Sequence, residues 1–432
     1  MASLLPILAV AVLGTVAAFL RVPDVSARTI WAEDGALFLH EYFDQGPGLL
    51  HPYAGYLHLL PRIVVAVVTP LFGLDAYALA ITVACSMILG LVAALTFYCA
   101  SALTSNLAAR LCWASIPVLV APGALETMAN VANLHWYLLW LAPWVLVKSP
   151  TTVGQKILLG VSALVIGLTE IQTAIFLPLV LFRWRNKSLW WAKAGLAAGV
   201  ACQLFTMWMY PRFDNNTGAK ADLLSVFYGY FLNSSSALVY GSSAAIRDNV
   251  QNFGALPIVA SALPFVAVAL LVAILGNRLQ RLAGATFLLA SGAVWGGAVI
   301  LNPAPWFNYA HFEPAAWGGF FLSRYSTVPS MFLLALIPLL MVIGSDRDPA
   351  VGSSRLAGLT ASPQFRWGLI GAFVVLQTVH FFALDPARET GPEWAPQIPA
   401  ARQACEADPG LESVDIQHAP GTWATVIRCE DL

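Results

Sequence analysis

Long runs of apolar residues, separated by short polar stretches, make up most of the chain. Many runs approach the roughly 20 residues that a helix needs to cross a bilayer, and they lack the alternation of a membrane barrel. Because lipid cannot satisfy open backbone groups, the pattern predicts an all-α polytopic membrane protein with about 11 to 13 transmembrane helices. The expected spans are residues 3–20, 57–73, 77–101, 111–122, 134–147, 157–182, 190–210, 256–276, 283–301, 326–344 and 367–384.

Composition supports this fold class. Of the 432 residues 59% are hydrophobic and only 10% are charged, which excludes a soluble globular domain. The net charge of -1 and the absence of a long basic tract give no sign of a nucleic-acid partner. Residues 2–20 are predicted to be a retained helix, because no basic region precedes them and no small-residue cleavage site follows.

Lys and Arg in short loops indicate the cytoplasmic side. Three basic groups mark such turns: Arg183, Arg185, Lys187 and Lys193; Arg278 and Arg281; and Arg347, Arg355 and Arg366. Four longer segments without such a basic cluster are rich in aromatic residues, Asn, Pro and Gly, and are expected on the extracytoplasmic side: residues 21–56, 211–255, 302–325 and 385–432.

The span 157–182 allows two arrangements. It is either one crossing or two half-length helices that turn at Thr169-Glu170, in which case one span between 57 and 122 does not cross. The second is favoured, because 111–122 and 157–168 are too short to span alone and short helices of this kind line cavities.

Hydrophobicity falls sharply near Asp385, which divides the chain into a transmembrane domain (1–384) and a small extracytoplasmic module (385–432). Strands are expected around Ser413–Ile416 and Thr422–Ile427. Cys405 and Cys429 lie in this polar tail, and a disulfide between them would require an oxidising compartment.

The first outer loop holds the most informative motif, the acidic pair Glu33-Asp34. A carboxylate at the membrane face can take a proton from an acceptor hydroxyl, as general bases do. A helix cap is the structural alternative. The same loop continues with further candidates for substrate or phosphate contact: His51, Tyr53, Tyr56, His58 and Arg62. The two tyrosines fit the membrane interface equally well. For Arg62 the alternative is a side chain that snorkels to the membrane surface.

A second polar group follows further along the chain. If residues 126–136 are helical, Glu126, Asn130 and Asn133 share one face, with His135 next to it. Amides at this spacing can bind a sugar, although asparagine can also join helices to each other. Glu170, between two short apolar runs, is a candidate site residue or a helix cap.

The outer loop 302–325 contains His311 and ends with Arg324-Tyr325. The planar fork of arginine suits a phosphate, which at the membrane surface would belong to a lipid headgroup. Snorkelling is the structural alternative for Arg324. Arg212, at the end of another helix, could assist from the same side. The sequence has no zinc-ligand spacing and no nucleotide-binding phosphate loop.

In this order of elements the chain resembles the GT-C superfamily of integral-membrane glycosyltransferases. The resemblance rests on one N-terminal helix, a long outer loop with Glu33-Asp34, and many helices, some of them short, over about residues 1–384. The stretch Tyr53–Arg62 is similar to a pattern in uncharacterised bacterial members.

The resemblance implies a polyprenyl-phosphate sugar donor, a glycan or lipid acceptor, and an active site on the outer face of a bacterial inner membrane. It makes Asp34 the expected general base, with Glu33 as its neighbour or substitute, and Arg324 the expected phosphate ligand. No cofactor is required, and a divalent cation at the acidic pair stays an alternative.

Two other functions compete with this one. A lipid-linked glycan transporter or flippase would use Glu126, Glu170 and the asparagines as a substrate path. A glycan ligase or polymerase would depend on Arg324, His311 and His51 instead.

Overall fold

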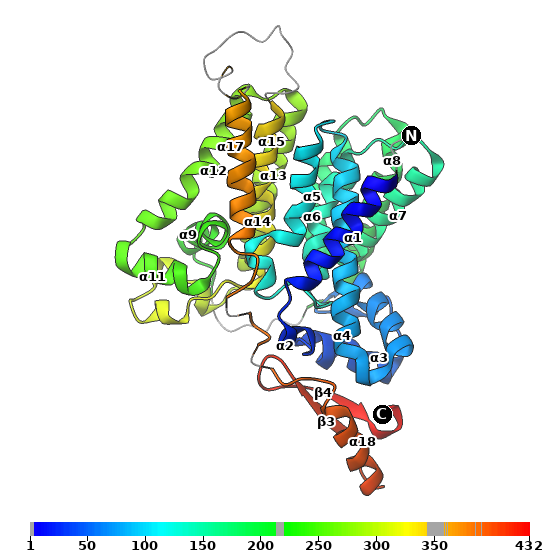
Figure 1. Cartoon of the computed structure of the whole chain (residues 1–432). Coiled ribbons are helices and arrows are strands. Elements are labelled where there is room, and N and C mark those ends of the chain that lie inside the picture. Colours follow the sequence, from blue (N-terminus) through cyan, green and yellow to red (C-terminus); the bar gives the residue numbers. More distant parts are fainter. Residues whose placement is uncertain are drawn as a thin grey trace.

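The computed structural model describes residues 4–212, 220–343, 358, 360, 362–384, 386–389 and 391–432, and the predictions on Arg347, Arg355 and Asp385 lie outside these residues. The described part is mostly helical with very little sheet, in agreement with an all-α membrane protein (Figure 1). The long helices of the first half are α1 (Leu4–Leu20), α4 (Leu59–Ala100), α5 (Leu107–Leu119), α6 (Leu134–Val147), α7 (Val153–Thr169) and α8 (Trp190–Met209).

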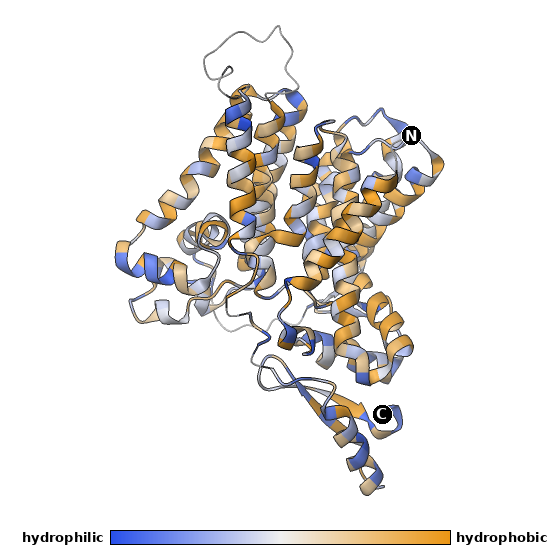
Figure 2. Cartoon of the chain, in the orientation of Figure 1, coloured by the Kyte–Doolittle hydropathy of each residue, from blue (hydrophilic) through white to orange (hydrophobic). Residues whose placement is uncertain are grey.

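The second half contains α9 (Leu223–Phe231), α10 (Ala237–Tyr240), α11 (Ser243–Phe253), α12 (Leu256–Leu275), α13 (Arg278–Leu301), α14 (Thr327–Leu334), α15 (Leu336–Ile343) and α17 (Pro363–Thr378). Among the described residues, five helical stretches are long and apolar enough to cross a membrane: Leu59–Ala100, Leu107–Ala124, Leu256–Leu275, Arg278–Leu301 and Arg324–Ile343. Figure 2 shows that apolar residues cover these helices, whereas polar residues gather at the helix ends and in the C-terminal module.

Helix α4 joins two stretches that the sequence predicted as separate spans. The break is at Gly73, whose φ of 64° is readily adopted only by glycine. Before the break, the Leu60 amide donates to Thr169 Oγ1 at 3.1 Å, and after it the Leu74 carbonyl accepts from Trp394 Nε1 at 2.8 Å. Both termini of the segment before Gly73 therefore lie at the same side of the helix bundle, the side that carries the C-terminal module.

The predicted span 157–182 is likewise broken. Helix α7 ends at Thr169, and the 3-10 helix η3 (Ile171–Leu181) follows after one extended residue, Glu170. The Glu170 carboxylate accepts the Gln172 amide at 2.7 Å, so it caps η3. This is the arrangement with two short helices.

Helices α7 and α8 pack closely because glycines face each other. A Cβ atom added to Gly199 would lie 2.8 Å from the Cα of Gly167. Small residues let helix backbones approach in this way where no hydrophobic effect drives association. This pair holds together the half of the molecule that carries Glu170.

The C-terminal module consists of α18 (Gln397–Ala407) and the antiparallel strands β3 (Ser413–His418) and β4 (Trp423–Arg428). A disulfide joins Cys405 in α18 to Cys429, which follows β4. The module also pairs with the first loop: the Ala32 amide donates to the Ala419 carbonyl at 2.6 Å, and the Ala419 amide donates to the Ile30 carbonyl at 3.1 Å.

We expect Gly199→Ala to destabilise the protein by about 1–3 kcal/mol, because the new methyl group overpacks the contact with α7. Thermal unfolding in detergent micelles measures this effect. Gly371→Ala in α17 is the matched control, since a Cβ there meets nothing within 4 Å. Equal stability of the two variants would contradict the close contact.

Candidate active site

A cavity of about 360 Å³ lies between the first loop, the start of α6, the α7–η3 junction and the ends of α8 and α13. Its size falls in the range of small-ligand sites. Ten of the residues singled out in the sequence line it: Glu33, Tyr53, Tyr56, His58, Asn133, His135, Glu170, Arg212, Arg324 and Tyr325.

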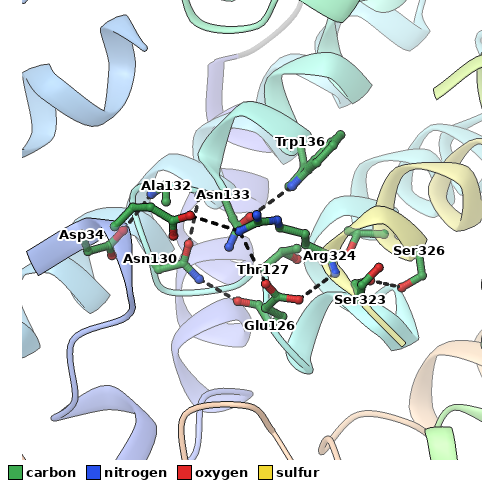
Figure 3. A network of polar contacts seen from close by, with 12 residues as sticks. Asp34, Glu126, Thr127, Asn130, Ala132, Asn133, Trp136, Ser323, Arg324 and Ser326 are labelled. Carbon is green, nitrogen blue, oxygen red and sulfur yellow. Dashed lines mark hydrogen bonds and ion pairs between the residues drawn. The ribbon is translucent and has the colours of Figure 1, made fainter. Parts of the chain in front are cut away.

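The two members of the acidic pair have different surroundings. Glu33 lines the cavity, whereas Asp34, the expected base, is 1% exposed and does not line it. The Asp34 carboxylate accepts the Val131 and Ala132 amides, each at 2.9 Å (Figure 3). Burial raises the pKa of Asp34 to about 7, although these two amides and Arg388 oppose the rise. Asp34 therefore ties two loops together.

The stretch around Glu126 is not helical, and its polar residues do not form a helix face. Ala129 has a φ of 58°, and α6 begins only at Leu134. The Asn130 side chain donates to the Glu126 carbonyl at 2.6 Å and accepts the Asn133 amide at 2.9 Å. Asn130 thus shapes the turn, and Asn133 alone of the two asparagines reaches the cavity.

Arg324 stands between two carboxylates. Its Nη1 lies 3.5 Å from Glu33 Oε1 and 3.8 Å from Glu126 Oε1, while its backbone amide donates to Glu126 Oε2 at 2.7 Å. A third of the Arg324 side chain is exposed. The two carboxylates hold the guanidinium in place at the cavity wall and leave part of it free for a ligand.

A buried histidine–glutamate pair lies on another wall. His135 Nδ1 is hydrogen-bonded to Glu170 Oε2, and the Gln172 amide donates to Glu170 Oε1. Glu170 is 1% exposed. Glu170 is therefore both a helix cap, as one reading of the sequence proposed, and part of the cavity wall.

Several polar atoms of the wall have no partner among the described residues. Both ring nitrogens of His58, Nδ2 of Asn133 and Oε2 of Glu33 are buried and make no hydrogen bond there. Burial lowers the pKa of His58 well below its usual value, which keeps the ring neutral. Because unpaired buried polar groups are costly, their gathering in the residues of one cavity makes this cavity the candidate site.

Aromatic rings complete the wall. The Trp136 ring is 4.2 Å from the His135 ring and meets Tyr325 edge-on at 5.8 Å. Tyr56 lies 4.3 Å from His58. Apolar ring faces beside hydrogen-bonding groups suit a ligand that has both kinds of surface.

Other predicted residues lie outside the cavity lining. Arg62 donates to Glu41 at 2.6 Å, and Glu41 also contacts the exposed His51 at 3.2 Å. His311 is exposed and lies 3.4 Å from Asp222. These three residues therefore contact carboxylates outside the cavity lining.

Two supporting residues were missed by the sequence analysis. Arg388 donates to the Ala129 and Met128 carbonyls at 2.7 and 3.1 Å, below the turn that Asp34 holds. The Gln203 side chain bonds both backbone groups of Leu57 at 2.7 and 3.0 Å. Only Gln203 had a sequence signal, as a lone polar residue within an apolar run.

In the described part of the chain, no group of three or more His, Cys, Asp and Glu side chains could hold a metal ion. Both oxygens of Asp34 are occupied by backbone amides, so the acidic pair does not offer two free carboxylates to a cation.

Comparison with protein-family models finds none that matches the chain, and comparison with curated proteins finds no significant match.

We expect Asp34→Asn to destabilise the protein by about 1–3 kcal/mol, because its amide NH₂ would face a backbone N–H and leave a buried donor unpaired. Glu33→Gln should change stability little, since the Glu33 side chain accepts one long hydrogen bond, from Arg324, within the described residues. Thermal unfolding of both variants measures the difference. An Asp34→Asn protein as stable as the wild type would show that the carboxylate does not hold the turn.

Proposed function

We propose that this protein is a multi-pass glycosyltransferase of GT-C type with about 11 to 13 crossings. It transfers a sugar from a polyprenyl phosphate to a cell-envelope glycan or lipid acceptor. The observation that carries the proposal is one cavity whose lining brings together Arg324, the Glu33 carboxylate, polar side chains and aromatic rings.

Arg324 is the proposed ligand of the donor phosphate, and Arg212 is the second arginine of the cavity wall. As the bond between the anomeric carbon and the phosphate oxygen breaks, the phosphate leaves with the electron pair. A guanidinium held ready by Glu33 and Glu126 stabilises the charge that develops there.

Sugar binding is assigned to the polar and aromatic residues of the lining. Asn133 and His58 supply hydrogen-bonding side chains, and Trp136 and Tyr325 supply apolar ring faces. Such a mixture suits a neutral polyhydroxylated ring better than a purely apolar ligand.

Glu33 takes the catalytic role in place of Asp34, because only Glu33 lines the cavity. In an inverting transfer, the acceptor hydroxyl loses its proton to the Glu33 carboxylate while its oxygen bonds to the anomeric carbon. Oε2 of Glu33 has no partner among the described residues, and the other oxygen contacts the phosphate ligand Arg324. Glu33 thus places the proton acceptor next to Arg324, the proposed ligand of the leaving phosphate.

A lipid-linked donor is supported by the cavity rim. Met207 and Leu301, near the ends of α8 and α13, line the cavity and are 44% and 71% exposed. Apolar side chains exposed in this way suit contact with bilayer lipid, so a donor whose tail remains in the membrane could present its phosphate to the cavity.

We place the site on the extracytoplasmic side of a bacterial inner membrane. The disulfide Cys405–Cys429 supports this placement, because such bonds persist in oxidising compartments. The module that contains it pairs with the loop that carries Glu33, so both are on the same side.

Transfer from synthetic polyprenyl-phosphate sugars by the purified protein tests the function. We expect Glu33→Gln to lower the rate by about 10²–10⁴-fold, because a general base is lost. Arg324→Ala should lower it by about 10²–10³-fold, because charge on the leaving phosphate is no longer stabilised.

Glu313→Gln and Arg247→Ala are the matched controls for Glu33→Gln and Arg324→Ala. Both residues are exposed or partly exposed and lie outside the cavity, so these variants should keep the wild-type rate. Full activity in Glu33→Gln would refute the assigned base. Specific donor binding without turnover by the wild-type protein would favour a transporter instead.

A further inference from the structure

The His135 ring is oriented by an unusually complete set of contacts. Glu170 is fixed by the Gln172 amide on one oxygen and by His135 Nδ1 on the other. The ring also packs on Trp136 at 4.2 Å and meets the edge of His58 at 6.2 Å. A side chain held from all these directions is pre-organised for one geometry.

These contacts also define which nitrogen carries the hydrogen. Oε1 of Glu170 accepts the Gln172 amide, so Oε2 is the oxygen that faces His135 Nδ1. We assign the hydrogen of this bond to Nδ1, and in that tautomer Nε2 carries a free lone pair. Nε2 makes no hydrogen bond within the described residues, and the exposed tenth of the side chain belongs to the cavity wall.

We propose that His135 Nε2 accepts a hydrogen bond from one hydroxyl of the transferred sugar and thereby determines which sugars are used. Glu170 is the positioning residue that holds the required tautomer. The proposal rests on the proposed glycosyl transfer and adds a specificity element to the same cavity.

The chemistry of Nε2 explains why this contact selects. Asn133, Arg324 and Arg212 offer hydrogen-bond donors to the sugar, whereas His135 Nε2, like the Glu33 carboxylate, offers an acceptor. Ring and glycosidic oxygens of a sugar can only accept, so a hydroxyl is the sugar group that can satisfy Nε2. A sugar without that hydroxyl would leave Nε2 unpaired within the closed complex, and sites of this kind reject such analogues strongly.

Monodeoxy and deoxyfluoro donors test the proposal. Farnesyl-phosphoryl mannose and glucose would be compared with their 2-, 3-, 4- and 6-substituted analogues by kcat/KM. For the wild type, kcat/KM should fall by about 10- to 100-fold when one particular hydroxyl is replaced by hydrogen or by fluorine, since neither group can donate a hydrogen bond. In His135→Phe, which keeps a planar ring, the ratio of kcat/KM for the parent donor to that for these analogues should fall to near one.

Glu170→Gln gives a sharper outcome. An amide NH₂ facing Nδ1 would move the ring hydrogen to Nε2, which then donates instead of accepting. The fluoro analogue at the selected position, which can only accept, should then be used at least as well as the parent sugar. His51→Phe is the matched control, because this histidine lies outside the cavity lining, and it should keep the wild-type ratio.

Each ratio compares two donors on one variant, so partial loss of folded protein cancels. Unchanged selectivity in active His135→Phe would overturn the proposal. It would also fall if His135→Phe altered selectivity only toward deoxy acceptors, because the hydroxyl would then belong to the acceptor. If the wild type transferred none of the parent sugars, the glycosyltransferase function itself would fail first.

Discussion

The arrangement of the candidate site depends on one carboxylate, that of Asp34. It accepts two successive backbone amides, Val131 and Ala132, from a loop about a hundred residues away. Those amides precede Asn133, His135 and Trp136 in the chain, so the contact places three wall residues beside Glu33. The contact joins the start of the π-helix Asp34–Leu39 to an irregular turn, which Arg388 also supports through the Ala129 and Met128 carbonyls.

The polar residues around the cavity form two shells. The outer residues, Asp34, Asn130 and Arg388, satisfy backbone groups and are themselves satisfied. The inner atoms of Glu33, Asn133 and His58 lack partners in the described part of the chain. A protein that leaves its inner groups unpaired while pairing the outer ones gives up stability where a ligand can restore it.

Much of the fold could be predicted from hydrophobic periodicity. The predicted span 134–147 coincides with α6, and 190–210 and 256–276 differ from α8 and α12 by one residue. The turn at Thr169-Glu170 was also predicted, because an acidic residue interrupts two short apolar runs. The break at Gly73 was not, because a glycine in an apolar run does not reveal whether its φ is positive.

The site was predictable by residue type but not by role. Ten of the expected residues line one cavity, since polar residues in a membrane protein are few and gather where a ligand is bound. Which of Glu33 and Asp34 faces the cavity depends on the local backbone, including the φ of 33° at Ala32. Arg388 was missed because its partners are backbone carbonyls, and these have no sequence signal.

The pairing of Ala32 with Ala419 sets a rule of parity for the whole chain. Two residues that share a backbone hydrogen bond cannot be on opposite sides of a membrane, so the crossings between the first loop and the tail must be even in number. In the proposed membrane arrangement α1 is one further crossing before the loop, so the proposed total is odd. That arrangement would put the two ends of the chain, drawn at opposite ends of the molecule in Figure 1, in opposite compartments.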